Sequence, residues 1–200
     1  MKKLCVALLL ALCCVFTGGA MASAAPTDYA KTLMTDAEKG DAESQLLLGF
    51  SYAQGKDGLP QNYQNAKKWY EASAAQGNAV AQLALGLMYQ EGQGVRQNYH
   101  TAKEWYERAA IQGDADAQLN LGTLYAKGQG VRQDYKKAVE WFKRAATQDK
   151  STAQFNLGIC YEKGYGVRKN LSEAKEWYGK ACDNGLQRGC NAYARLNKRR

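Results

Sequence analysis

Residues 115–150, ADAQLNLGTLYAKGQGVRQDYKKAVEWFKRAATQDK, decide the fold of this chain, because their pattern returns along the sequence at a fixed interval. Tryptophan occurs four times, at Trp69, Trp105, Trp141 and Trp177, and each copy lies 36 residues from the next. Glycines, tyrosines and alanines keep the same interval in the later copies. A constant period in this range is typical of a repeat protein whose units stack side by side.

The quoted stretch predicts two helices joined by a glycine-containing turn. Leu121 and Tyr125 lie on one apolar face of the first helix, at helical spacing. Gly128 supplies the left-handed backbone conformation at which such a helix ends. Asp134 is a suitable N-cap for a second helix, which we expect to run to about Gln148. Each repeat is therefore expected to be a pair of helices.

The small and aromatic positions indicate how the pairs pack. One helical hairpin cannot cover its own apolar face, so stability has to come from stacking neighbouring hairpins. We expect Gly122 to let the two helices approach closely. We expect the four tryptophans to fill the core, with no role in binding a cofactor or ligand.

Counting the copies predicts an all-α solenoid of four repeats with a half repeat at each end. The repeats are assigned to residues 42–78, 79–114, 115–150 and 151–186, with a capping helix in 25–41 and a capping helix and basic tail in 187–200. Half-repeat caps are expected in a solenoid, since they cover the apolar faces of the terminal units. We therefore expect a complete array without an attached catalytic domain.

The N-terminus has the features of a cleaved signal peptide. Lys2 and Lys3 precede an apolar run over residues 4–16, and small residues end in an Ala-Ser-Ala sequence at Ala24. The apolar run is shorter than the roughly 20 residues that span a bilayer. We expect cleavage after Ala24, or else after Ala22, and export to a bacterial periplasm, with secretion as the alternative.

The charge of the exported chain restricts its partners. Removing the signal lowers the formal charge from +8 to +6, and the last three residues hold half of it. Lysines and glutamates otherwise alternate, as in Lys103-Glu104, without the basic stripe that a nucleic-acid binder shows. We expect no nucleic-acid partner, no stable membrane insertion after cleavage and a monomeric protein. A weak attraction to anionic surfaces stays open.

The pattern closely resembles one known repeat family. Residues 79–114 show it as Ala81-Gln82, Leu85-Gly86, Tyr89, Gly92-Gln93-Gly94-Val95, Tyr99, Ala102, Trp105-Tyr106, Ala109-Ala110 and Gly113. These positions resemble the Sel1-like repeat, which is related to the tetratricopeptide repeat, over nearly all of residues 42–186. The resemblance implies a right-handed α/α superhelix that acts as a protein-interaction scaffold. Exported bacterial members are associated with envelope machinery and host interaction.

By that resemblance, a partner protein or peptide binds on the concave face, which the first helix of each repeat lines in related proteins. The partner-binding candidates are Phe50, Gln54, Leu87, Gln90, Glu91, Thr123, Lys127, Ile159, Glu162 and Lys163. Several are apolar and could receive a helix or an extended peptide. Others could instead complete the packing between hairpins. We keep two alternatives to the scaffold: a protein that binds cell-wall fragments or β-lactams, and a secreted host-interaction factor.

Three cysteines remain after signal cleavage. Cys182 and Cys190 lie on two helices expected to be adjacent and antiparallel, and an exported chain meets oxidising conditions, so we expect a disulfide between them. The spacing also resembles that of cysteine-rich secreted members of the family. Cys160 has no candidate partner. We interpret it as a buried free thiol, with a reactive thiol or a bridge between two copies as the alternative.

Signals of catalysis are nearly absent. Ser172 and Lys175 match the Ser-x-x-Lys of penicillin-recognising enzymes, but the Ser-Asp-Asn and Lys-Thr-Gly motifs that accompany it do not occur. Asn170 as an N-cap with Glu173 explains this stretch better. His100 is the only histidine, and no metal-ligand spacing can be built around it. We therefore expect no enzyme activity, no catalytic residue, no cofactor and no metal site.

Overall fold

The computed structural model describes residues 25–198, so the predicted signal sequence of residues 1–24 and the last two residues lie outside the described part. Ten helices and no strand occur between residues 25 and 198. They are α1 (Asp28–Glu38), α2 (Ala42–Gln54), α3 (Tyr63–Ala75), α4 (Ala79–Glu91), α5 (Tyr99–Ile111), α6 (Ala115–Lys127), α7 (Tyr135–Ala146), α8 (Ser151–Lys163), α9 (Leu171–Asp183) and α10 (Gln187–Asn197).

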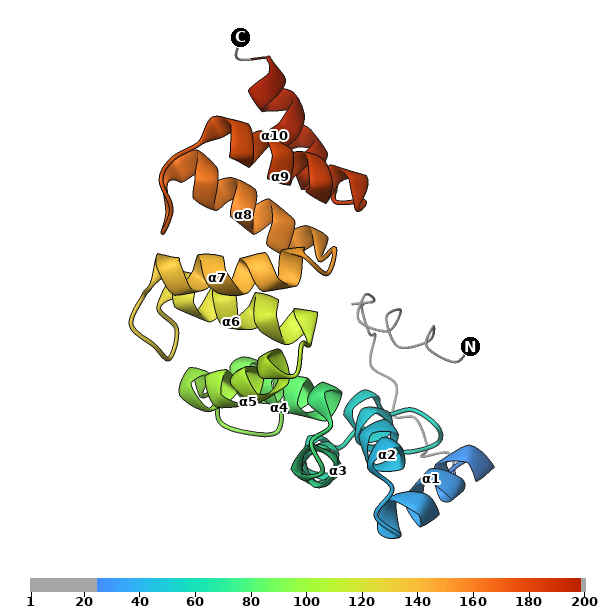
Figure 1. The fold of residues 1–200 in the computed structure, drawn as a ribbon. Coiled ribbons are helices and arrows are strands. Elements are labelled where there is room, and N and C mark those ends of the chain that lie inside the picture. The colour runs from blue at the N-terminus through green and yellow to red at the C-terminus, as the bar shows by residue number, and fades with distance from the viewer. Residues whose placement is uncertain (1–24, 199–200) are drawn as a thin grey trace.

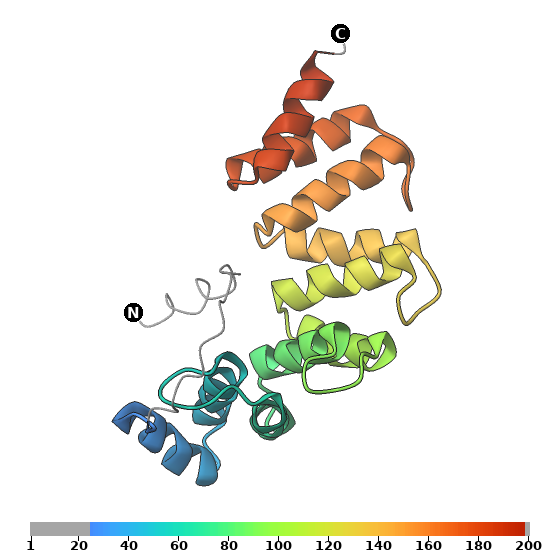
Figure 2. The ribbon, with the colours of Figure 1, turned by 180° about the vertical axis from the view of Figure 1, so that it is seen from behind.

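The helices form an elongated array in which each helix packs on the ones before and after it in the chain. Figure 1 shows α1 and α10 at opposite ends, with the pairs α2–α3, α4–α5, α6–α7 and α8–α9 stacked between them. The view from behind in Figure 2 shows the direction of the helices turning gradually along the stack. This is the α/α solenoid that the sequence predicts, and the prediction of an all-α repeat fold is confirmed.

Recurring caps explain why the helices begin and end where they do. The side chain of Asp134 accepts hydrogen bonds from two backbone amides in the first turn of α7, and Asn98 does the same for α5. These bonds satisfy amide groups that have no partner within the helix. The first helix of every repeat ends at a left-handed glycine, at Gly55, Gly92, Gly128 and Gly164. One predicted bound differs slightly, because α7 ends at Ala146 rather than Gln148.

Each hairpin is closed by an aromatic ring lying on a glycine. A Cβ added to Gly86 would lie 2.4 Å from the ring of Tyr106, and one added to Gly122 would lie 2.7 Å from the ring of Phe142. Tyr70 covers Gly49 and Tyr178 covers Gly158 in the same way. The predicted close approach is therefore made by a ring from the second helix, which uses the space that a side chain would fill.

The expectation that the tryptophans fill the core needs correction. Trp105 and Trp141 are only half-buried, whereas the next residue in each repeat, such as Tyr106, is fully buried. A cation lies over the outer face of the indole ring: the guanidinium of Arg108 is 4.4 Å from the centre of the Trp105 ring, and that of Arg144 is 4.5 Å from the Trp141 ring. Tryptophan thus forms the boundary between core and solvent.

A second layer of the core is polar. The buried Gln118 donates a hydrogen bond to the carbonyl oxygen of Ala110, and its own oxygen accepts one from the side chain of Gln148. The same arrangement recurs around Gln45, Gln82 and Gln154. Because a buried amide is costly without partners, this repeated bridge ties each first helix to the end of the preceding helix and to the turn after its own second helix.

Candidate functional site

One row of side chains marks the same position on every first helix. Phe50, Leu87, Thr123 and Ile159 lie on α2, α4, α6 and α8, and all four are half-buried. Part of this burial is internal packing, because the ring of Phe50 meets that of Tyr70 edge-on at 5.4 Å between centroids. One repeat period after Ile159 is Arg195 on α10, which is the fifth member of the row. We call the surface around this row the first-helix face.

The polar candidates differ in how far they are available to a ligand. Gln54, Glu91, Lys127 and Lys163 are exposed at the C-terminal ends of the first helices. Gln90 is half-buried, and its side-chain oxygen accepts a hydrogen bond from the hydroxyl of the buried tyrosine on the next helix. The exposed side chains could contact a partner, while Gln90 has a role within the repeat.

The structure brings three candidates together in one open cavity of about 400 Å³ between α8 and α10. Ile159, Glu162 and Lys163 line it, as do six residues that the sequence did not suggest: Phe155, Tyr178, Arg188, Asn191, Ala192 and Arg195. The lining combines apolar side chains, which we call the floor, with basic and amide side chains, which we call the rim. Such a cavity can accept an apolar side chain or chain end with polar groups at its margin.

A charged network holds the two walls of this cavity together. The guanidinium of Arg195 donates hydrogen bonds of 2.8 and 2.6 Å to the two carboxylate oxygens of Glu162. The hydroxyl of Tyr178 donates a third, of 2.8 Å. The Glu162 side chain is 8% exposed, so most of its water has been replaced by these donors. Arg195 occupies the same register as Ile159, one repeat later, and therefore belongs to the first-helix face.

These donors stabilise the charged form of Glu162. The hydrogen bonds from Arg195 lower its pKa from 4.5 to about 2; burial opposes this shift, and the hydroxyl of Tyr178 adds to it. Because the pKa of Glu162 is lower in the folded state than in the unfolded state, its interactions contribute fully to stability above the unfolded-state pKa. This contribution is lost as the pH falls through the folded pKa. We therefore expect α10 to loosen from α8 between about pH 4.5 and pH 2.

The Glu162→Gln variant tests this network. We expect it to lose about 1–2 kcal/mol of unfolding free energy at neutral pH, since the half-exposed Arg195 is partly screened by water. The loss should shrink as the pH falls toward 2, when wild-type Glu162 also becomes neutral. Chemical unfolding at several pH values measures both effects.

The second repeat supplies a natural model for this variant, because Gln90 accepts a hydrogen bond of 3.1 Å from Tyr106 there. The fold therefore tolerates glutamine in this register, and a failure to fold is not expected. An unchanged pH dependence in Glu162→Gln would contradict a role for this carboxylate.

The predicted disulfide is present, joining Cys182 of α9 to Cys190 of α10. It ties the helix that carries Arg195 to the last full repeat. Cys160 is a free, buried thiol, and burial raises its pKa to about 11. At neutral pH the thiol therefore stays protonated, which disfavours the alternative of a reactive cysteine.

The residues considered for chemistry are not assembled into a site. The ammonium of Lys175 lies over the ring of Tyr193, 5.4 Å from its centre, and the backbone of Ser172 is bound by the N-cap Asn170. His100 is exposed on α5 beside Glu104. Between residues 25 and 198, no group of three or more metal-ligating side chains is found. None of the described helices has the length and hydropathy needed to cross a membrane.

Sequence reasoning missed six of the nine lining residues, and four of these lie on α10, which it treated only as a cap. Adding one repeat period to Ile159 points to Arg195, and adding it to Phe155 points to Asn191. The 36-residue period therefore identifies both residues of α10. They were not recognised because both positions change from an apolar residue to a polar one.

Comparisons with known proteins agree with this geometry. A family model for the Sel1 repeat matches residues 42–78, 79–114, 115–150 and 151–186. A protective antigen present in uropathogenic Escherichia coli strains, which displays an SLR fold, is 38% identical with a TM-score of 0.83. The match covers 85% of this chain and 36% of that protein. Among curated protein sequences, none matches the chain.

Two further solved structures are similar. A Sel1 repeat protein from Oxalobacter formigenes is 34% identical with a TM-score of 0.75, over 82% of this chain and 65% of that one. The cysteine rich protein B of Helicobacter pylori is 21% identical with a TM-score of 0.53, over 66% of this chain and 94% of that one, and it shares the fold. The chain thus spans about a third of the Escherichia coli protein and just under two thirds of the Oxalobacter protein.

Sel1 repeat proteins are generally scaffolds that bind other proteins and are typically without enzyme activity. The four consecutive matches cover most of the chain, and the helix pairs follow the same period. The chain therefore belongs to the Sel1 repeat family.

Proposed function

We propose that this protein is a non-enzymatic scaffold that binds a partner protein or peptide on its first-helix face. The observation that carries the proposal is the cavity between α8 and α10, which is lined by Ile159, the last of the four half-buried residues in the row that starts at Phe50. An apolar anchor of the partner would enter the cavity, and the rest of the segment would run along the row toward α2.

The charges at the rim of the cavity favour a ligand that carries a negative group. Lys163 and Arg188 line the cavity together with Asn191, while Glu162 is already neutralised by Arg195. The charges left for a ligand are therefore positive. A bulky apolar residue next to a carboxylate, such as the C-terminal residue of a peptide, would complement both the floor and the rim.

We further propose that the scaffold works in the bacterial envelope, in the periplasm. The signal-like N-terminus supports export, and a disulfide is consistent with an oxidising compartment. Secretion toward a host is the alternative, and the description of the 38% identical relative as a protective antigen supports it.

Site-specific photo-crosslinking in living cells tests the binding face. A photoreactive amino acid is placed at Thr123 or Ile159 on the first-helix face, or at Lys143 on the exposed surface of α7. We expect a defined partner to be captured from the first two positions and not from the third. Capture from all three positions with equal yield would contradict the proposal.

A charge-insertion variant gives the matched control. Leu87→Glu combined with Ile159→Glu should reduce capture from Thr123 at least tenfold, because a carboxylate would be placed where the partner's apolar groups lie. Ile111→Glu makes the same change at a residue that is 75% exposed on another surface, and it should leave the yield unchanged.

A further inference from the structure

The long loops between the two helices of a repeat carry an excess of positive charge, and they are not part of the first-helix face. Residues 92–99, 128–135 and 164–171 together hold four lysines and arginines and one aspartate, and Lys136 and Lys137 follow directly in the first turn of α7. The corresponding loop of the first repeat, residues 55–63, holds one lysine and one aspartate. The surplus is thus confined to repeats two to four, where an arginine occurs at a fixed position: Arg96, Arg132 and Arg168.

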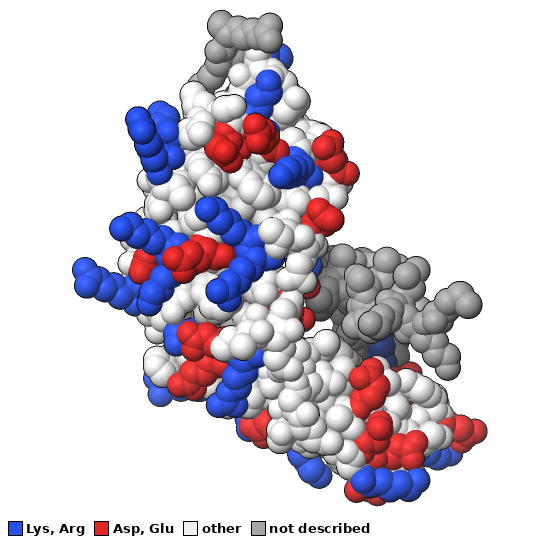
Figure 3. Space-filling model, viewed as in Figure 1, with Lys and Arg blue, Asp and Glu red and all other residues white. Residues whose placement is uncertain are grey.

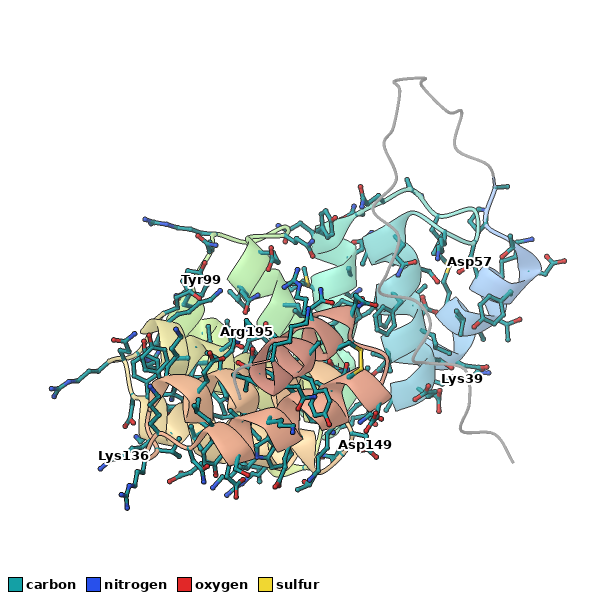
Figure 4. All side chains as sticks on the ribbon, turned by 90° about the horizontal axis from the view of Figure 1, so that it is seen from above. Lys39, Asp57, Tyr99, Lys136, Asp149 and Arg195 are labelled. Atoms are coloured by element: carbon teal, nitrogen blue, oxygen red, sulfur yellow. A yellow bond between two sulfur atoms is a disulfide. The ribbon has the colours of Figure 1, made fainter. Side chains whose placement is uncertain are left out.

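These arginines are exposed, and within residues 25–198 none of them has a carboxylate at ion-pair distance. Figure 3 shows basic side chains gathered along the side where the α6–α7 and α8–α9 loops project. Seen from above in Figure 4, Tyr99 and Lys136 lie on this side, whereas Asp149 and Lys39 lie on the other. We call this surface the basic loop edge.

Two equivalent open grooves lie along the basic loop edge, one repeat apart. The first, of about 610 Å³, is lined by Lys67, Tyr89, Arg96 and other residues of the second repeat's loop. The second, of about 640 Å³, is lined by Lys103, Tyr125 and Arg132, which are the same positions 36 residues later, and by Lys136 and Lys137. Each groove therefore offers cationic groups beside an aromatic ring.

The loops that carry the arginines are held in fixed positions. Gly130 has a φ of +68°, and a Cβ added to it would lie 2.5 Å from the backbone of Tyr99, at the start of the preceding repeat's second helix. The side chain of Gln133 donates hydrogen bonds to the carbonyl oxygen of Ala126 and the hydroxyl of Tyr135. Gly94 and Gly166 make the same close approach to Tyr63 and Tyr135, so the repeat period sets the spacing of the arginines.

We propose that the basic loop edge is a second docking surface, which binds an extended acidic segment of a partner protein. Aspartate or glutamate side chains of that segment would enter the two grooves and pair with Arg96 and Arg132, and a further one would pair with Arg168 on the next loop. Lys67 and Lys103 already pair with Glu71 and Glu107, at 2.6 and 2.8 Å. The attraction is therefore provided by the arginines and, in the second groove, by Lys136 and Lys137.

The arrangement of the loops favours a chain over a membrane as the occupant. Figures 1 and 2 show the α4–α5, α6–α7 and α8–α9 loops following the turn of the solenoid rather than lying in one plane. A flexible peptide can follow such a path, whereas a flat bilayer would reach few loops at a time. The grooves are also recessed between neighbouring repeats, where a side chain can enter.

The test measures binding of fluorescein-labelled poly-glutamate to the full chain by fluorescence anisotropy. We expect binding that weakens as salt is added, and a loss of at least tenfold in affinity when Arg96, Arg132 and Arg168 are changed together to glutamine. The three side chains are exposed, so unfolding by heat should be unaffected in this variant. Absence of poly-glutamate binding to the wild type would overturn the proposal.

A matched variant tests whether the affinity depends on the position of the arginines or only on the net charge of the protein. Changing Lys56, Lys143 and Lys198 to glutamine removes the same charge from exposed positions elsewhere, and it should keep the affinity within about twofold. An equal loss in both variants would overturn the proposal. So would binding to phosphatidylglycerol vesicles without binding to poly-glutamate, which would indicate a membrane surface instead.

A second control separates this surface from the first-helix face. The Leu87→Glu and Ile159→Glu double variant should bind poly-glutamate as well as the wild type does, because neither residue lines a groove of the basic loop edge. A loss there would show that the acidic peptide binds the first-helix face.

Discussion

The Tyr106→Ala variant is expected to lose about 3–5 kcal/mol of unfolding free energy. Tyr106 is completely buried, and its ring fills the space above Gly86. Removing the ring leaves a cavity that the two helices cannot close without moving, since Gly86 has no side chain to fill it. It also removes the hydroxyl that donates a hydrogen bond to Gln90. Urea unfolding followed by circular dichroism measures the loss.

The neighbouring residue provides the control for this prediction. Trp105→Ala removes a larger side chain, but Trp105 is half-buried and its outer face is covered by Arg108. We expect a smaller loss, of about 1–2 kcal/mol. Tyr106→Phe keeps the ring and loses the hydroxyl alone, for about 1 kcal/mol. If Trp105→Ala were the more destabilising change, the assignment of the buried layer would be wrong.

The period of the sequence was sufficient to predict the fold, because each repeat makes the same local contacts. The helix ends are equally local: Gly128 ends α6 and Asp134 caps α7 as predicted, since both depend only on residues within a turn or two. Pairing of Cys182 with Cys190 was also predictable, because the two cysteines lie on successive helices.

Sequence periodicity could not predict which of the aromatic residues within a repeat is the more buried. Trp105 and Tyr106 both lie toward the apolar side of α5, and a helix turns only about 100° per residue, so their order of burial depends on the neighbouring helix. Gly86 on that helix decides in favour of Tyr106. The buried role of Gln118 was missed for the same reason, because both of its partners come from other elements.

The candidate site was predicted only in part. Ile159 and Lys163 were named from the first-helix pattern and do line the cavity beside α10. Arg195 was missed because it departs from the apolar residues in its register, and its role depends on Glu162 in another repeat. Arg132 recurs with the repeat period, but the groove beside it is formed by residues of neighbouring repeats, so the sequence of one repeat does not predict it.

The second large effect is expected from removing the disulfide. Changing Cys182 and Cys190 together to serine should lower the unfolding free energy of the C-terminal unit by about 2.5 kcal/mol, from the entropy of closing an eight-residue loop. The loss should be local, because α10 packs mainly on α9, and helices of a solenoid contact only their neighbours. Hydrogen exchange should therefore quicken in α10 far more than in α4.

The same change connects stability with binding. α10 supplies Asn191 and Arg195 to the cavity, so loosening it should weaken partner capture from Ile159 more than capture from Thr123, which lies a full repeat away. Adding a reductant to the wild type should reproduce the variant's hydrogen exchange, while the variant itself should not respond. Equal acceleration of exchange in α4 and α10 would show that the bridge stabilises the whole array, and the cavity would then have no special dependence on it.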